Sequence, residues 1–165
     1  MVHLTRHAHE LLARQHGVAS TQQLLDTGLS ARQLRHLQRS QDLELVLRGA
    51  YRTPSAPDTE LARCAAVCAA RSDVAIAGPT AGRLWGFRRL PADQRIHVLA
   101  APASNPSIAR WVVPFRTDAR HDHDVVERHD GIRITTRART AYDLARWLGP
   151  DDLLSVIDQA AHDGR

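Results

Sequence analysis

The first forty residues contain three short helix-forming segments, and this feature constrains the fold more than any other. Apolar residues at helical spacing predict a first helix over 3–16. A second short helix follows, with Ser20 or Thr21 as its cap, and Ser30 is a suitable N-cap for a third helix over 31–40. Three short helices, the last two joined by a tight glycine-containing turn, predict a helix-turn-helix.

After the third helix the apolar spacing changes from helical to alternating. Leu43, Leu45 and Leu47 alternate with other residues, which predicts a strand that carries all three on one face. A turn at 48–50 and a returning strand at 51–53 complete a hairpin. A hairpin placed directly after a helix-turn-helix predicts a winged helix.

A proline-containing linker after residue 53 divides the chain into two expected domains. Residues 1–53 form the winged helix-turn-helix, and residues 58–165 form a small mixed α/β domain, so the fold class is α+β. The expected helices of the second domain are 58–71, 79–86, 138–148 and 150–163. The expected strands are 74–78, 95–100, 110–116 and 132–136.

The basic residues differ from those of an average protein in kind and in position. All 22 are arginine, for which a GC-rich coding bias is the simpler explanation, and the net charge is +4. The lack of lysine excludes sites that depend on one, such as a Walker phosphate site or a Schiff base. Positive charge is concentrated near the N-terminus, where 1–52 holds seven arginines and four acidic residues.

The predicted third helix has one basic and one apolar face. At 100° per residue, four basic side chains fall within an arc of roughly 100°. These are Arg32, Arg35, His36 and Arg39. Leu34 and Leu37 fall on the opposite side, so the helix has the pattern of a DNA recognition helix.

Roles within this predicted double-stranded DNA interface follow from position. The side chains expected to read bases are Arg32, Gln33 and His36. Those expected to contact phosphates are Arg35, Arg39, Arg48 and Arg52. Thr21, Gln22 and Ser30 complete the set. Two other interpretations stay open: a solvated charged face, or a surface that binds an acidic protein.

Several short motifs occur along the chain. In the N-terminal part they are the segments 17–24, 28–30 and 48–52. In the second part they are the segments 75–81, 84–87, 96–98, 131–136, 139–140 and 143–145. Together these motifs resemble those of AbiEi-family antitoxins, the antitoxin halves of type IV toxin–antitoxin pairs. The resemblance covers almost the whole chain.

The resemblance implies a cytoplasmic repressor that binds inverted repeats in its own promoter, which allows a dimer on DNA. The genetic partner would be a nucleotidyltransferase-like toxin that forms no stable complex with the antitoxin. The motif of the antitoxin domain would be Thr136, Arg139, Thr140 and Asp143. Some relatives continue into a nuclease-like domain, similar to very-short-patch repair endonucleases. One alternative is therefore that the chain is the N-terminal regulatory part of such a protein. A ligand-responsive regulator is another.

The sequence favours neither an enzyme nor a cofactor or metal site. Solvated segments explain the histidines of two regions more simply than metal binding does: His3 with His7, and the denser run 121–124. Arg139 and Asp143 lie four residues apart on a predicted helix, which indicates an ion pair rather than a catalytic pair. No stretch is long and apolar enough for a membrane span or a signal peptide.

Overall fold

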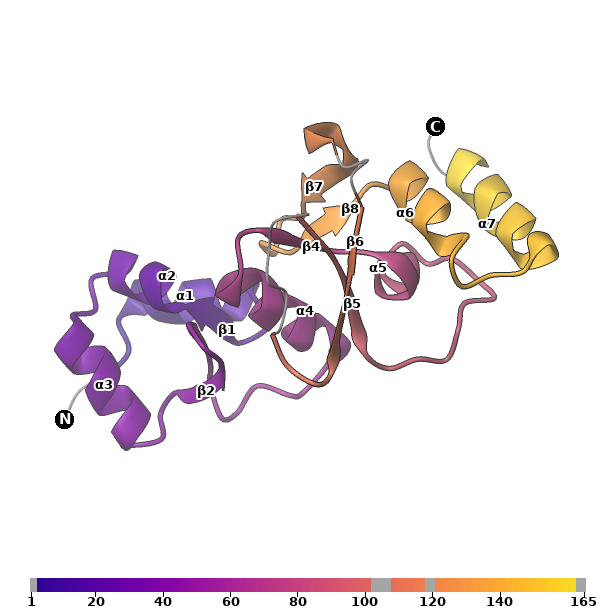
Figure 1. Cartoon of the computed structure of the whole chain (residues 1–165). Coiled ribbons are helices and arrows are strands. Elements are labelled where there is room, and N and C mark those ends of the chain that lie inside the picture. The colour runs from indigo at the N-terminus through magenta and orange to yellow at the C-terminus, as the bar shows by residue number, and fades with distance from the viewer. Residues whose placement is uncertain (1–2, 102–107, 118–120, 163–165) are drawn as a thin grey trace. The chain divides into compact units, whose positions relative to one another are not determined.

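The structure is a computed structural model, and it describes residues 3–101, 108–117 and 121–162. By its own contacts the chain divides into two units. The first comprises Met1–Ser72 with His129–Gly131, and the second comprises Asp73–Arg128 with Ile132–Arg165. Figure 1 shows the elements of each unit along the chain.

The first unit is a winged helix followed by a further helix. Its helices are α1 (Arg6–Arg14), α2 (Thr21–Asp26), α3 (Ala31–Arg39) and α4 (Glu60–Ala70). Its strands are β1 (Val18–Ser20), β2 (Glu44–Leu47) and β3 (Ala50–Arg52). The three strands form an antiparallel sheet in the order β1-β3-β2. The predicted helix-turn-helix and hairpin are thus both present, and the α+β fold with an N-terminal winged helix is confirmed.

Serine caps fix where α2 and α3 begin. Ser20 caps α2 and Ser30 caps α3, and each forms a capping box with the glutamine three residues later. At the wing, Gly49 has a φ of +90°, a backbone conformation that a residue without a Cβ adopts readily. These local signals were readable in the sequence, which explains why α2, α3 and the hairpin of the wing were predicted.

The predicted face of the wing strand is wrong at Leu45. The pairing of β2 with β3 shifts register between Leu45 and Leu47, so the simple alternation is interrupted. Leu43 and Leu47 are buried, whereas Leu45 is 59% exposed. The sequence also gave no sign of β1, a short strand whose formation depends on pairing with β3.

Helix α4 packs within the first unit, although the sequence placed it at the start of the second domain. Its inner face is made of small apolar residues, among them Ala66 and Val67, both 0% exposed. Helix α4 contacts β1 and β3. The winged helix is therefore extended by one helix beyond the expected linker.

The second unit contains a five-stranded mixed sheet with helices. Its strands are β4 (Val74–Ile76), β5 (Ile96–Ala100), β6 (Val112–Arg116), β7 (Val125–Glu127) and β8 (Arg133–Thr135), in the order β6-β5-β4-β8-β7. Its helices are α5 (Gly78–Leu84), the 3₁₀ turn η1 (Asp122–Asp124), α6 (Arg137–Leu144) and α7 (Pro150–His162). The expected elements are present with ends that differ by a few residues. The edge strand β7 and η1 were not predicted.

Strand register builds the core of this second unit. Ile76 on β4 lies opposite Val98 on β5 and Ile134 on β8, and all three side chains are 0% exposed. Burying apolar surface in this way is the main favourable contribution to folding. Beyond the sheet, α6 and α7 pack through Leu144 and Val156, which are also 0% exposed.

The core of the first unit allows a matched test of packing. We expect Leu24→Ala to destabilise the first unit by about 2–5 kcal/mol, because the side chain is 0% exposed and its removal leaves a cavity. Leu45→Ala removes the same atoms from an exposed site and should change stability by less than about 0.5 kcal/mol. Amide hydrogen exchange of the α3 backbone measures both effects, and equal effects of the two substitutions would contradict this account of the core.

Candidate DNA interface and the second-unit motif

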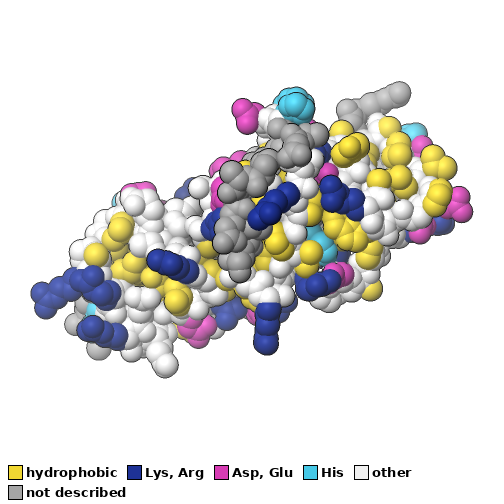
Figure 2. All heavy atoms as spheres, viewed as in Figure 1, with side chains coloured by type: hydrophobic (Ala, Val, Ile, Leu, Met, Phe, Trp, Pro, Cys, Tyr) yellow, Lys and Arg dark blue, Asp and Glu magenta, His cyan; other side chains and the backbone are white. Residues whose placement is uncertain are grey.

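Helix α3 exposes a basic face and buries its apolar one. Leu34 and Leu37 are 4% and 1% exposed and pack in the core of the first unit. Three predicted arginines of this helix lie on its exposed side: Arg32, Arg35 and Arg39. Exposed His36 lies among them. Figure 2 shows dark-blue arginine side chains gathered over the region of α3.

The charges of this face are not neutralised by neighbouring carboxylates. Within the described residues, Arg32, Arg35 and Arg39 form no ion pair. Asp42, which follows the helix, instead accepts a hydrogen bond from the Ser40 hydroxyl. Unpaired guanidinium groups on one face are suited to phosphate oxygens and to the acceptor edge of guanine.

The cap of α3 engages two of the predicted DNA-binding residues. The Ser30 hydroxyl accepts a 3.2 Å hydrogen bond from the Gln33 backbone N–H. In return, Gln33 Oε1 accepts from the Ser30 backbone N–H at 2.9 Å and from its hydroxyl at 2.8 Å. Ser30 and the amide oxygen of Gln33 therefore have a structural role in starting the helix.

The predicted residues of α2 differ in exposure. Thr21 is half-buried, and its backbone N–H donates to the carbonyl of Gly49 at 2.9 Å, which ties α2 to the turn of the wing. Gln22 is exposed, and its side chain donates to Asp26 on the same helix at 2.8 Å. Of the two residues, Gln22 is the more exposed.

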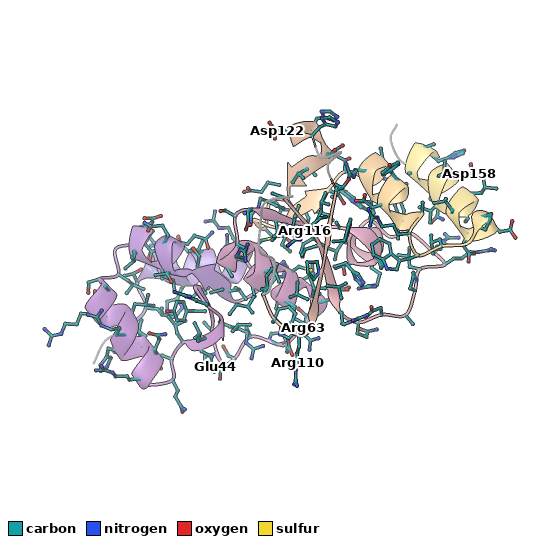
Figure 3. The ribbon with its side chains drawn as sticks, in the orientation of Figure 1. Glu44, Arg63, Arg110, Arg116, Asp122 and Asp158 are labelled. Atoms are coloured by element: carbon teal, nitrogen blue, oxygen red, sulfur yellow. The ribbon has the colours of Figure 1, made fainter. Side chains whose placement is uncertain are left out.

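The two arginines of the wing have different surroundings. Arg48 is exposed at the hairpin turn and forms no ion pair within the described part of the chain. Arg52 is 22% exposed on its side chain, and it lies 3.2 Å from Glu44 and 3.7 Å from Asp58. Figure 3 labels Glu44 on β2. Two carboxylates therefore compensate the charge of Arg52, whereas Arg48 has no carboxylate partner among the described residues.

In the second unit, the predicted motif is an internal network. Arg139 is 6% exposed, and its Nε donates to Asp143 Oδ1 at 3.0 Å, as the ion-pair interpretation predicted. Its Nη1 donates to Asp124 Oδ2 at 2.8 Å. Thr136 caps α6 by accepting from the backbone N–H of Arg139. The buried hydroxyl of Thr140 donates to the carbonyl of Thr135 at 3.2 Å.

Asp124 is a member of this network that the sequence did not reveal. It lies in η1, fifteen residues before Arg139, so no helical spacing connects the two. Burial alone would raise the pKa of Asp124, but the backbone N–H of His121 and the guanidinium of Arg139 hold that pKa below its ordinary value. Burial raises the pKa of Asp143, against the opposing charge of Arg139.

A second cluster brings a buried hydroxyl and a buried imidazole together with a partly exposed carboxylate. His97 Nδ1 lies 3.2 Å from Thr80 Oγ1, and His97 Nε2 lies 3.4 Å from Asp93 Oδ2. Thr80 and His97 are only 0% and 1% exposed, and burial lowers the pKa of His97. A nucleophile without access to solvent cannot meet a substrate, so this cluster holds β5 against α5.

The histidines considered as metal ligands are exposed. His121 and His123 stack with ring centroids 5.2 Å apart, and His3 and His7 are exposed on the first unit. Among the residues that the structure describes, no three His, Cys, Asp or Glu side chains are grouped to hold a metal ion. No described helix has the length and apolar character needed to cross a membrane.

Helices α6 and α7 form an apolar groove of about 450 Å³. Its lining residues are Ala138, Ala141, Tyr142, Ala145, Leu153, Ile157, Ala160 and Ala161. A small-molecule site usually combines apolar walls with a few polar groups that orient the ligand. The hydroxyl of Tyr142 is the one polar side-chain group in this lining, which does not favour the ligand-responsive alternative.

The winged helix of the first unit matches a known protein family. A family model described as a transcriptional regulator, AbiEi antitoxin, matches residues 9–54, the stretch from α1 to the end of the wing. The AbiEi resemblance is confirmed over this stretch. The motifs quoted for the second part lie outside the matched residues, and no curated protein sequence matches the chain.

A solved structure shares the fold over most of the chain. The RV2827C protein from Mycobacterium tuberculosis is similar with a TM-score of 0.55 and 21% sequence identity. The match covers 93% of the present chain and 65% of the RV2827C chain, so the present chain spans about two thirds of that protein. At this identity the likeness shows the fold alone.

The network around Arg139 can be tested by removing its cation. We expect Arg139→Ala to destabilise the second unit by about 3–5 kcal/mol, because Asp143 is left buried without its counter-charge. The control is Arg95→Ala, which removes the partner of Asp93 from an exposed pair worth less than about 1 kcal/mol. All three tryptophans lie in the second unit, so their fluorescence during denaturation reports it selectively. Similar losses of unfolding free energy for both variants would show that the buried network contributes no more than an exposed ion pair.

Proposed function

We propose that the chain is a DNA-binding transcriptional autorepressor and antitoxin of the AbiEi type, which binds inverted repeats in its own promoter. The observation that carries this proposal is the exposed face of α3, whose arginines have no carboxylate partners within the described residues. The match of residues 9–54 to a family of transcriptional regulators supports it.

In this proposal α3 enters the major groove of double-stranded DNA. Arg32 and His36 lie on its exposed face, where they can reach base edges. Arg35 and Arg39 on the same helix, with Arg48 on the wing, contact phosphates. Inverted repeats place two such helices on one operator, which is consistent with a dimer on DNA.

The antitoxin role rests on the family description rather than on a residue of the second unit. A nucleotidyltransferase-like toxin would be the genetic partner, without a stable complex, and both proteins would act in the cytoplasm. The motif residues Arg139, Thr140 and Asp143 are buried, so they would serve this role by shaping α6. No catalytic step is assigned to the chain.

Substitutions on α3 and on the wing should affect DNA binding differently. We expect Arg32→Ala or His36→Ala to lower discrimination at one position of a half-site by about 1–3 kcal/mol. Arg48→Ala should weaken binding to every sequence and reduce the salt slope by about one, because a phosphate contact releases counterions. Gel shifts with promoter duplexes and single-base variants, at several salt concentrations, measure both effects.

Arg63→Ala is the matched control, since Asp58 already holds the Arg63 guanidinium at 2.9 and 2.7 Å. It should bind promoter DNA like the wild type. Wild-type affinity and discrimination in both the Arg32 and His36 variants would refute the assignment of α3. Salt-insensitive or absent binding of the wild-type protein would instead favour a protein partner for this face.

A further inference from the structure

The capping box of α3 limits what its first turn can recognise. Gln33 Oε1 accepts two hydrogen bonds from Ser30, one from the backbone N–H at 2.9 Å and one from the hydroxyl at 2.8 Å. An amide oxygen has two lone pairs, and both are thereby used. Only the amide N–H groups of Gln33 stay available to a ligand.

This arrangement removes the usual way in which glutamine recognises adenine. In that pairing the amide oxygen accepts from the N6 amino group while the amide nitrogen donates to N7. Gln33 could form it only by releasing Ser30, which would leave the backbone N–H and the hydroxyl of Ser30 without this partner and open one half of the capping box.

The rest of the exposed face also consists mainly of donors. Arg32, Arg35 and Arg39 have guanidinium groups, which donate and cannot accept. His36 offers one N–H and, when neutral, one accepting nitrogen. There is no carboxylate on α3, and the acidic side chains next to it in sequence each already accept a hydrogen bond: Asp26 from Gln22, Asp42 from Ser40, and Glu44 from Arg52.

A surface of donors is complementary to the acceptors of guanine. In the major groove guanine presents N7 and O6, both acceptors, whereas cytosine and adenine are distinguished by amino groups that need an acceptor. We propose that α3 selects guanine, with Arg32 spanning O6 and N7 and the amide of Gln33 donating, and that it does not read the amino groups of adenine or cytosine. This inference rests on the proposed DNA-binding function and specifies its ligand.

The first experiment identifies the preferred bases and then removes single atoms from them. Duplexes selected from a random pool by the full-length protein give the preferred half-site. At each preferred guanine, 7-deazaguanine lacks the N7 acceptor and should weaken binding roughly tenfold. At each adenine of the site, a purine base without the N6 amino group should bind within about twofold of the parent duplex.

The second experiment changes Gln33 while keeping its cap. Gln33→Glu still accepts from Ser30, as glutamate does in capping boxes, and turns a second carboxylate oxygen outward as an acceptor. We expect this variant to gain a preference for cytosine at one position. Gln23→Glu makes the same change in the equivalent capping box of α2 and should leave the selected sequence unchanged. Thermal melting of both variants confirms that they fold.

The outcomes separate this inference from the function on which it rests. Guanine-rich half-sites that are sensitive to 7-deazaguanine, with the altered preference of Gln33→Glu, support it. Half-sites that depend on adenine amino groups overturn the inference, whether that adenine preference is lost in Gln33→Ala or in His36→Ala. The proposed DNA-binding function still stands in that case. If the wild-type protein selects no duplex at any salt concentration, the proposed function fails and the inference fails with it.

Discussion

The packing of Leu34 and Leu37 against the core of the first unit determines what α3 presents to its surroundings. A helix can bury only one face, and these two leucines, 4% and 1% exposed, fix its rotation about its own axis. The arginines on the other side are therefore directed outward together. The cap at Ser30 fixes where the helix begins, and so which side chains occupy its first turn. The basic face is a consequence of apolar packing and a cap.

The features that could be predicted from the sequence are those that depend on near neighbours in the chain. The caps at Ser20 and Ser30, the helical spacing and the glycine turn are local signals, and they placed α1 to α3 and the wing. The basic face of α3 followed from the same spacing. What could not be predicted depends on residues distant in sequence: β1 exists because it pairs with β3, and Leu45 is exposed because of a register shift.

The two groups of predicted site residues differ in the same way. On α3 the predicted side chains are exposed, and they can meet a ligand directly. In the second unit, Arg139 and Asp143 form a buried pair, and Asp124, which lies on another element, is a second partner of Arg139. Arg52 lies between these two cases, because its side chain is partly exposed but Glu44 and Asp58 compensate its charge. Sequence spacing identified which residues interact along a helix, but not which charges other elements had already compensated.

In the proposed function, the outward arginines of α3 contact DNA, whereas the carboxylate-bound arginines do not. The most direct measurement is NMR of the arginine Nε–H groups during titration with a promoter duplex, with signals assigned from single substitutions. We expect the signals of Arg32, Arg35 and Arg39 to shift, whereas those of Arg52 and Arg139, which are held by carboxylates, stay in place. Unchanged α3 signals under conditions in which the duplex binds would show that α3 is not the DNA-binding surface.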